Sequence, residues 1–350
     1  MITIALLNAL IALPPGSPGG VPRVTTLRYN QHRVLSLDTA PKRGDKVLDL
    51  DGSTIYPGLV NAHDHLELNH YPRTKFREVY VNAAQWSADF TPKLTHEPFR
   101  TLRQMPLDRQ CQIGGDKNAR AGVTTVAHHN PLHRPLRHRK FPVRVVNRYG
   151  WSHSFAFETD SSLQSSYQYT PRDAPWCIHL AEGTDLDAAA EFTRLVTLGL
   201  LQSNTVLIHG VGLSEVDRHR LIAIGAGLVW CPSSNYFLLG KTAEVALIAG
   251  AHRLALGSDS RLTADGDLLD ELRAAFATGQ LTAAQLFRTV TIDAAALLCI
   301  RGVGDLAVGC QPDFFTVRKP VSDPYRALID VRPDDIALRC YRGHLTESPQ

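Results

Sequence analysis

The sequence predicts an α/β protein built around a TIM-like (β/α) barrel, and two features of the chain predict it. From residue 57 onward, short apolar runs typical of buried strands alternate with stretches of helical period. Repeated strand–helix units over this length are typical of parallel strands closed into a barrel. Most of these apolar runs also end in a polar residue, and the carboxyl ends of barrel strands open on the face where active sites lie.

The elements follow one another in a regular order. Residues 1–56 read as short strands, because apolar segments alternate with turns rich in proline and glycine. Barrel strands are expected at 59–62, 123–127, 143–147, 176–180, 206–208, 227–231 and 254–256. Helices are expected at 185–198, 214–224 and 267–277, followed by a helical pair at 282–300.

The end of the chain is expected to return to its beginning. Residues 304–317 and 336–341 read as strands, and the first 56 residues alone have little core. We therefore predict a small β-sandwich domain formed by 1–56 and 304–350, and a barrel domain at 57–303.

One barrel unit is expected to be shortened or distorted. The stretch between Gly150 and Trp176 leaves little room for a complete strand–helix unit, and residues 161–169 do not read as a helix.

Composition narrows the class of protein. The net charge of +3, without a long single-sign run, gives no support for nucleic-acid binding, and the basic segment 133–140 reads as a solvated loop. The six scattered cysteines form no Cys-x-x-Cys pair, which is typical of free thiols in a reducing, cytoplasmic compartment. No apolar run reaches the roughly 18 residues of a membrane span. The apolar residues 1–14 read as a first strand, with a secretory segment as the alternative.

A candidate metal site begins with His63 and His65. Residues i and i+2 of a strand point to the same face, so both imidazoles would aim at one point while Asp64 turns away. Two converging imidazoles make half of a transition-metal site. A packed or surface histidine pair is the alternative, since the chain has 15 histidines.

Later strand ends supply further ligands. His179 is followed three residues later by Glu182, His209 ends the next run, and Asp259 follows the last run. Each alone has an ordinary reading: a core histidine, a turn residue or a capping aspartate. Together they would place imidazoles and carboxylates on one barrel face, a donor set that suits Zn²⁺ or Fe²⁺. Glu182 could then act as the acid and base beside one divalent metal.

The ordered motifs resemble those of the metal-dependent amidohydrolase superfamily. The resemblance rests on residues 57–65, His179-Leu180-Ala181-Glu182, His209, Cys231-Pro232-Ser233-Ser234-Asn235, Gly257-Ser258-Asp259 and residues 304–314. It is strongest to the branch of cytosine, guanine and methylthioadenosine deaminases and triazine hydrolases, and it spans nearly the whole chain.

The resemblance implies a role for each matching position. His63, His65, His179 and Asp259 would bind one divalent metal, with Zn²⁺ preferred and Fe²⁺ as the alternative. Glu182 would shuttle the proton, and His209 would hydrogen-bond the activated water or the developing oxyanion. Asp259 would also accept a proton from that water. No lysine lies between Phe141 and Gly240, where binuclear relatives carry a carboxylated lysine, so a mononuclear site is expected.

The predicted function is hydrolytic deamination of an amino-substituted heterocycle, such as a purine or pyrimidine, by hydroxide that the metal activates. Alternatives are ring opening of a cyclic amide, dechlorination of a triazine-like ring, or a non-catalytic barrel stabilised by metal. The expected partner is a small-molecule substrate, with neither nucleic acid nor membrane, and the resemblance allows a homo-oligomer.

Five side chains are candidates for substrate binding. They are Glu67, His128, Trp151, Asn235 and Arg261. Three of them have a structural alternative: Glu67 could begin a helix, Asn235 could hold a turn, and either His128 or His129 could be packed inside the fold. Trp151 and Arg261 are the weaker candidates.

Overall fold

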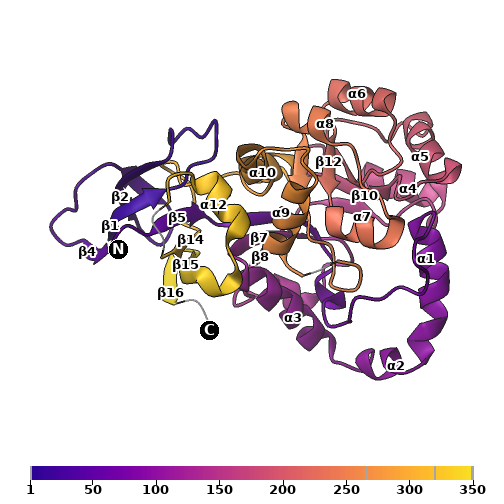
Figure 1. Ribbon diagram of the computed structural model, residues 1–350, viewed down its shortest axis with the longest axis horizontal. Helices are drawn as coiled ribbons and strands as arrows, with labels where there is room; N and C mark the ends of the chain where they lie inside the picture. Colours follow the sequence, from indigo (N-terminus) through magenta and orange to yellow (C-terminus); the bar gives the residue numbers. More distant parts are fainter. Residues whose placement is uncertain (1, 265, 319–320, 348–350) are drawn as a thin grey trace.

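The protein is described by a computed structural model that covers residues 2–264, 266–318 and 321–347. A mixed β-sheet forms one end of the molecule and a barrel of strands and helices forms the other (Figure 1). None of the described helices is long and apolar enough to cross a bilayer.

Eight parallel strands form the barrel within the described residues, in two hydrogen-bonded ladders. The first ladder contains β6 (Leu59–Asp64), β7 (Val123–His128) and β8 (Arg144–Val145). The second contains β9 (Gly150–Ser152), β10 (Trp176–Leu180), β11 (Thr205–His209), β12 (Gly227–Trp230) and β13 (Leu254–Leu256). The last strand returns to the first, because the Asp259 amide donates to the His63 carbonyl at 3.1 Å. The predicted α/β barrel is confirmed.

The helices after β10, β11 and β13 form where their period predicted them. They are α5 (Leu186–Thr197), α6 (Glu215–Ile224) and α9 (Leu268–Ala277). Side-chain caps explain where they begin: Asp185, Ser214 and Asp267 each accept a hydrogen bond from the first helical turn. The expected helical pair is α10 (Ala283–Thr289) and α11 (Ile292–Leu297).

Further helices lie outside those predictions. They are α1 (Ala83–Phe90), α2 (Phe99–Leu102), α3 (Leu107–Arg120), α7 (Pro232–Leu239), α8 (Ala246–Gly250) and α12 (Pro324–Asp330). Short 3₁₀ turns occur at Leu66–Leu68, Thr91–Thr95, Arg134–Arg137 and Pro333–Asp335.

The interpretation of residues 161–169 as non-helical was wrong. They belong to α4 (Asp160–Tyr169), which begins at a Thr159 cap and buries Leu163. The helix packs on β10 through both polar and apolar contacts: the Trp176 indole donates to Ser166 Oγ at 3.0 Å and meets the Tyr167 ring edge-on at 5.4 Å between centroids. A complete unit therefore does fit between β9 and β10.

The shortened unit lies earlier in the chain. Only residues 146–149 connect β8 to β9, and the described connection from β7 to β8 contains a 3₁₀ turn rather than an α-helix. One wall of the barrel is thus formed by connecting loops, while the wall after β10 has regular crossover helices.

Both ends of the chain contribute to the mixed sheet. Its strands are β1 (Ile4–Ile11), β2 (Arg23–Tyr29), β3 (Val34–Leu37), β4 (Lys46–Asp49), β5 (Thr54–Pro57), β14 (Phe314–Val317), β15 (Ile336–Tyr341) and β16 (His344–Glu347). The two ends meet where β5 pairs antiparallel with β14. The strand expected over 304–317 is limited to β14. The predicted division into domains, and the sandwich arrangement, stay predictions.

Aromatic packing joins the sheet to the barrel. Tyr56 of β5 stacks on Phe315 of β14 at 5.3 Å between ring centroids and meets Phe287 of α10 edge-on at 6.1 Å. All three rings are fully buried, and burial of such a side chain contributes about 1.5–3 kcal/mol. β6 follows β5 after one glycine. This aromatic packing therefore helps to fix the position at which β6 enters the barrel.

Candidate metal centre and active site

Three residues at the carboxyl ends of barrel strands have a left-handed backbone. Ala181 follows β10 with φ +52°, His209 ends β11 with φ +73°, and Asp259 follows β13 with φ +51°. This conformation is unfavourable for residues other than glycine, and it persists where surrounding contacts enforce it. Each strand thus turns abruptly at its end, which places Glu182, His209 and Asp259 over the mouth of the barrel.

The imidazoles predicted as ligands converge. The ring centroids of His63 and His65 are 4.8 Å apart, and His179 lies 5.0 Å from His63 and 5.4 Å from His65. One possible ligand atom from each of these three rings lies within 4.8 Å of the others, and the same holds for His63, His209 and Asp259. All five side chains are buried.

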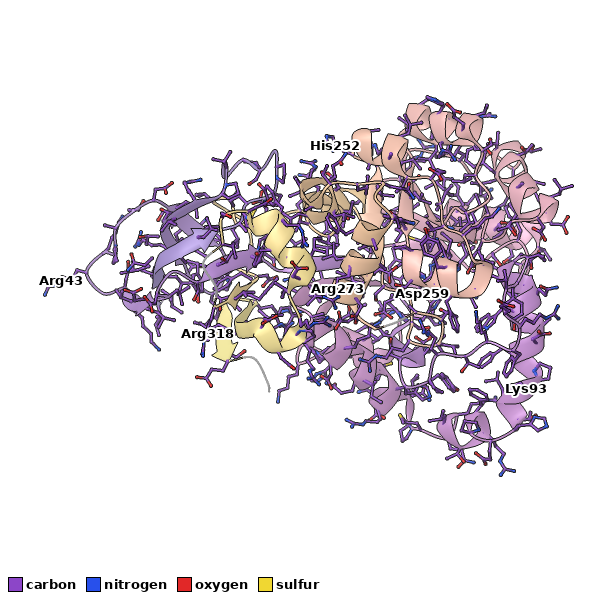
Figure 2. All side chains as sticks on the ribbon, in the orientation of Figure 1. Arg43, Lys93, His252, Asp259, Arg273 and Arg318 are labelled. Atoms are coloured by element: carbon purple, nitrogen blue, oxygen red, sulfur yellow. The ribbon has the colours of Figure 1, made fainter. Side chains whose placement is uncertain are left out.

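The carboxylate of Asp259 faces the histidine pair of β6. Its Oδ1 lies 3.7 Å from His63 Nε2 and 3.8 Å from His65 Nε2. Figure 2 labels Asp259 inside the barrel end of the molecule. Asp259 is held by the Ser260 amide at 2.7 Å and the Thr263 hydroxyl at 3.0 Å. The four predicted ligands therefore surround one point.

Hydrogen bonds fix which ring nitrogens are free. The His153 carbonyl lies 2.9 Å from His179 Nδ1, and the Asn235 amide oxygen lies 2.9 Å from His209 Nδ1. Because both oxygens only accept, each Nδ1 carries a proton, and the two Nε2 atoms are left to face the site.

The ligand cluster passes a direct test of fit to a divalent metal. His63 Nε2 is buried without a hydrogen-bond partner among the residues that the structure describes, which is unfavourable unless a ligand occupies the point it faces. Three neutral imidazoles and one carboxylate are the donors that Zn²⁺ and Fe²⁺ prefer.

Burial also favours the protonation states that ligation requires. It lowers the pKa of His63 and His179 well below the ordinary value, and neighbouring imidazoles lower it further. For Asp259, burial alone would raise the pKa, but the nearby His65 and His209 and two hydrogen bonds lower it overall. The rings are thus neutral and the aspartate ionised.

Glu182 lies beside this cluster but outside it. Its Oε1 is 3.5 Å from His209 Nε2, and burial raises the pKa of the Glu182 carboxyl to about 7, against the opposing effect of His209. The carboxyl can therefore both accept and release a proton near neutral pH. Behind it, Glu191 of α5 accepts a hydrogen bond from the strained Ala181 amide at 2.6 Å.

A cavity of about 870 Å³ opens above the cluster. His65, His179, Glu182, His209 and Asp259 line its inner end. Aromatic side chains that line it are Trp86, Trp151, Phe155 and Phe157, and polar ones include Asn82, Asn130, Ser154 and Glu158. This volume and mixture of surfaces suit a small organic molecule.

The predicted substrate-binding residues lie in different places. Trp151 lines the cavity, and Asn235 holds His209. Glu67 is buried against Asn130, and His128 lies 3.7 Å from Glu67 beneath the site. The Arg261 side chain is exposed and is not among the described residues that line the cavity.

Two further histidines lie at the site: His129, which the sequence offered only as the alternative to His128, and His153, which sequence reasoning missed. The ring of His129 lies 4.3 Å from that of His179, and its Nε2 donates to the Ser152 carbonyl at 3.0 Å. The ring of His153 lines the cavity 5.0 Å from that of His179. The pair 128–129 at the end of an apolar run signalled a contribution from β7, but β9, which precedes His153, is too short to show a pattern.

The barrel, its buried histidine and aspartate cluster and the adjacent glutamate define the class of metal-dependent hydrolases. Residues 144–337, more than half of the chain, match the model of the Amidohydrolase family. The chain belongs to that family.

Two deaminases align with most of this chain, in agreement with this assignment. A 5-methylthioadenosine/S-adenosylhomocysteine deaminase of Haloquadratum walsbyi is 26% identical over 289 residues, covering 68% of this chain and 63% of that protein. One from Natronomonas pharaonis is 28% identical over 292 residues, covering 70% and 66%. The chain thus spans slightly less than two thirds of the length of these relatives.

Solved structures share the fold. An adenosine deaminase from Xanthomonas campestris with bound zinc superposes with a TM-score of 0.78 at 18% identity, covering 98% of this chain and 92% of that one. An atrazine chlorohydrolase from Arthrobacter aurescens in complex with zinc gives 0.78 at 16% identity, covering 99% and 96%.

Proposed function

We propose that this chain is a mononuclear metal-dependent hydrolase that removes the amino group from a nitrogen heterocycle, such as a purine, a pyrimidine or a related ring. The observation that carries the proposal is Glu182, a partly buried carboxyl with a pKa of about 7 beside a converged set of metal ligands. The alignments to methylthioadenosine/S-adenosylhomocysteine deaminases support it.

His63, His65, His179 and Asp259 would hold the metal. A divalent ion bound there would supply Lewis acidity, which lowers the pKa of a water molecule towards 7. The absence of lysine between Phe141 and Gly240 supports one metal rather than two.

Proton transfer is assigned to Glu182. In the overall reaction, water adds to the ring carbon that carries the amino group, the C–N bond breaks, and the products are a ring carbonyl and ammonia. Glu182 Oε1 would accept one proton from the water and deliver it to the ring nitrogen. Asp259, whose pKa lies below the ordinary value and which is ionised, would accept the second proton and pass it to the amino group, which leaves as ammonia.

His209 would stabilise the tetrahedral intermediate. Its Nδ1 is held by Asn235, so Nε2 faces Glu182 and the mouth of the barrel. A proton shared between Nε2 and the Glu182 carboxyl can be directed at the developing oxyanion, and positioned donors of this kind account for a large share of rate acceleration. The surrounding aromatic side chains would exclude water and contact the ring faces.

The test is ammonia release by the zinc-loaded and iron-loaded protein from a panel of aminopurines, aminopyrimidines, pterins and aminotriazines. We expect release from at least one class, and a kcat lower by about 10²–10⁴-fold in Glu182→Gln with metal content unchanged. Glu158→Gln is the matched control. Glu158 also lines the cavity, but its carboxylate accepts hydrogen bonds from the His153 amide and the Ser162 hydroxyl and has no part in the proposed proton transfer.

Other outcomes separate the alternatives. Release of chloride from a halogenated triazine, or a ring-opened product without ammonia, would replace deamination by another hydrolysis at the same site. A Glu182→Gln protein that keeps most of its kcat would refute the role of this residue. A protein that binds metal but acts on no member of the panel would contradict deamination.

A further inference from the structure

A buried lysine lies beneath the candidate metal centre and takes no part in the proposed chemistry. Lys117 of α3 has a side chain only 1% exposed, and its Nζ lies 2.9 Å from Oδ2 of Asp64, which is fully buried. A buried ammonium is unfavourable unless it is paired and hydrogen-bonded. Asp64 stands between His63 and His65, so this ion pair is directly connected to the histidine pair.

Each of the three N–H donors of Lys117 has an acceptor. One is Asp64, the second is Ser258 Oγ at 3.2 Å, and the third is the Asp259 carbonyl at 3.0 Å. The ammonium therefore binds the two segments that carry metal ligands, β6 and the turn after β13. Asp259 has an unfavourable left-handed backbone, which needs such an external restraint.

Asparagine side chains complete the network around Asp64. Asn118 donates to Oδ2 at 2.7 Å, and Asn69 donates to Oδ1 at 2.8 Å. Asn61 accepts from the Ser258 amide at 3.0 Å and donates to Ser258 Oγ at 2.8 Å. A connected and satisfied polar network of this kind imposes one arrangement on the segments that it joins.

Helix α3 reaches this position because it packs unusually close to the 3₁₀ turn Leu66–Leu68, which follows β6. A Cβ at Gly114 would lie 2.2 Å from the Leu66 carbonyl oxygen, so glycine is required at that contact. Gly114 lies one helical turn before Lys117 and Asn118, and Asn118 Nδ2 also donates to its carbonyl at 2.9 Å. The close approach therefore places both polar side chains under the strand that carries the histidine pair.

We propose that Lys117 and Asp64 form a positioning pair for the metal centre, which holds the His63–His65 pair and the Asp259 carboxylate directed at one point. The pair touches neither metal nor substrate and acts through the backbone of residues 63–65 and 258–259. This inference rests on the ligand set of the proposed function, but it does not depend on which substrate the protein uses.

The experiment measures zinc affinity by chelator competition and the absorption spectrum of the cobalt-substituted protein, together with thermal unfolding of the metal-free protein. The variants are Lys117→Met, Asp64→Asn and the double variant. Each single variant leaves a buried group unpaired, so we expect a lower Tm and zinc binding weaker by about 10–100-fold. The double variant is expected to recover most of the Tm but not the zinc affinity or the cobalt spectrum, because the Asp259 carbonyl still lacks the ammonium that ties it to α3 and keeps only the local Ser258 hydroxyl at 3.2 Å.

A second ion pair provides the control. Arg28 of β2 and Asp45, in the turn just before β4, are 2.8 Å apart with side chains 8% and 6% exposed, and they lie at the other end of the molecule. We expect Arg28→Met with Asp45→Asn to change the Tm without changing the zinc affinity.

Recovery of wild-type zinc affinity and cobalt spectrum in the Lys117→Met/Asp64→Asn protein would overturn the proposal. The only role left to the pair would then be the mutual neutralisation of two buried charges. If Lys117→Met does not fold, the double variant decides the question. A wild-type protein that binds no zinc would instead overturn the ligand set, and with it both proposals.

Discussion

The two walls of the barrel are built differently. After β10, β11 and β13, regular helices return the chain, and two of these strand ends are braced by a neighbouring helix. Glu191 of α5 holds the Ala181 amide, and Asn235 of α7 holds His209. On the other wall, loops at 129–143 and 146–149 replace crossover helices. That wall brings His129, Asn130, Trp151 and His153 to the site or its cavity.

This difference indicates a division of labour. The regular wall fixes strained strand ends, so it can hold ligands and a proton shuttle in one geometry. The loop wall forms much of the cavity above them, where a change of shape would alter which molecule fits. Substitutions in the first wall should therefore affect metal binding and kcat, and substitutions in the second should affect KM.

The largest effect is expected for a ligand from the regular wall. In His179→Ala, zinc affinity should fall by more than the roughly 100-fold that removal of an outer partner causes, and turnover should be abolished. His153→Ala is the matched control, since residue 153 supports His179 through its backbone carbonyl, which alanine retains. Equal loss of zinc in both proteins, measured by chelator competition, would contradict the proposed division.

The second effect tests the brace behind Glu182. In Glu191→Leu the Ala181 amide loses its acceptor in a buried place, and we expect kcat to fall by about 10–100-fold with zinc content unchanged. Glu191→Gln keeps an acceptor oxygen and should retain most of the activity. Steady-state kinetics on the substrate found in the panel would measure both, and a similar kcat in the two variants would remove Glu191 from this role.

A smaller effect is expected on the loop wall. Trp151→Leu removes an aromatic face from the cavity, and one stacked ring is worth about 0.5–1.5 kcal/mol beyond the area that it buries. KM should rise by about 3- to 10-fold, while kcat and zinc content stay near wild type. A fall in kcat without a change in KM would show that this wall also shapes the reacting geometry.

The smallest effect on turnover is expected for Glu271, which stabilises the regular wall. Its Oε1 accepts from the Ser233 amide at 2.8 Å, and burial raises the pKa of the carboxyl to about 8. The folded state therefore binds this proton more tightly than the unfolded state, so stability is full below about pH 4.5 and declines as pH rises towards 8.

Glu271→Gln keeps the acceptor and is neutral at every pH. Its gain in unfolding free energy should be small near pH 5 and reach roughly 1–3 kcal/mol at pH 8, with activity unchanged. Thermal unfolding at pH 5, 6.5 and 8 measures this trend. A gain that does not increase with pH would exclude a buried, neutral Glu271.

The converging residues could be predicted from sequence because they lie in or just after apolar strands. His63 and His65 share a strand face by spacing alone. His179 and His209 lie within entirely buried strands, and Asp259 closely follows another. Their convergence follows from barrel geometry. The backbone angles that aim Glu182 and Asp259 do not follow from residue type, since alanine and aspartate rarely adopt them.

Other features gave weak or conflicting signals. Helix α4 is rich in serine and buries only Leu163, so no apolar stripe marks it. The pairing of β6 with β7 changes register between residues 61 and 64, so alternation along the strand could not show whether His128 or His129 faces the site. The position of the Lys117 side chain beneath the site depends on how closely α3 packs, and tertiary contacts at Gly114 set that distance.

The sheet built from both ends of the chain also determines the order of folding. Residues 54–57 pair with residues 314–317, so this ladder cannot form until the chain has been synthesised through the whole barrel segment as far as β14. Contacts between such distant parts of a chain form slowly because a long loop must close first. During translation, the edge of β5 stays unpaired until β14 has been made. A chain that ends before β14 would keep this edge exposed, where it could pair with other unfinished chains.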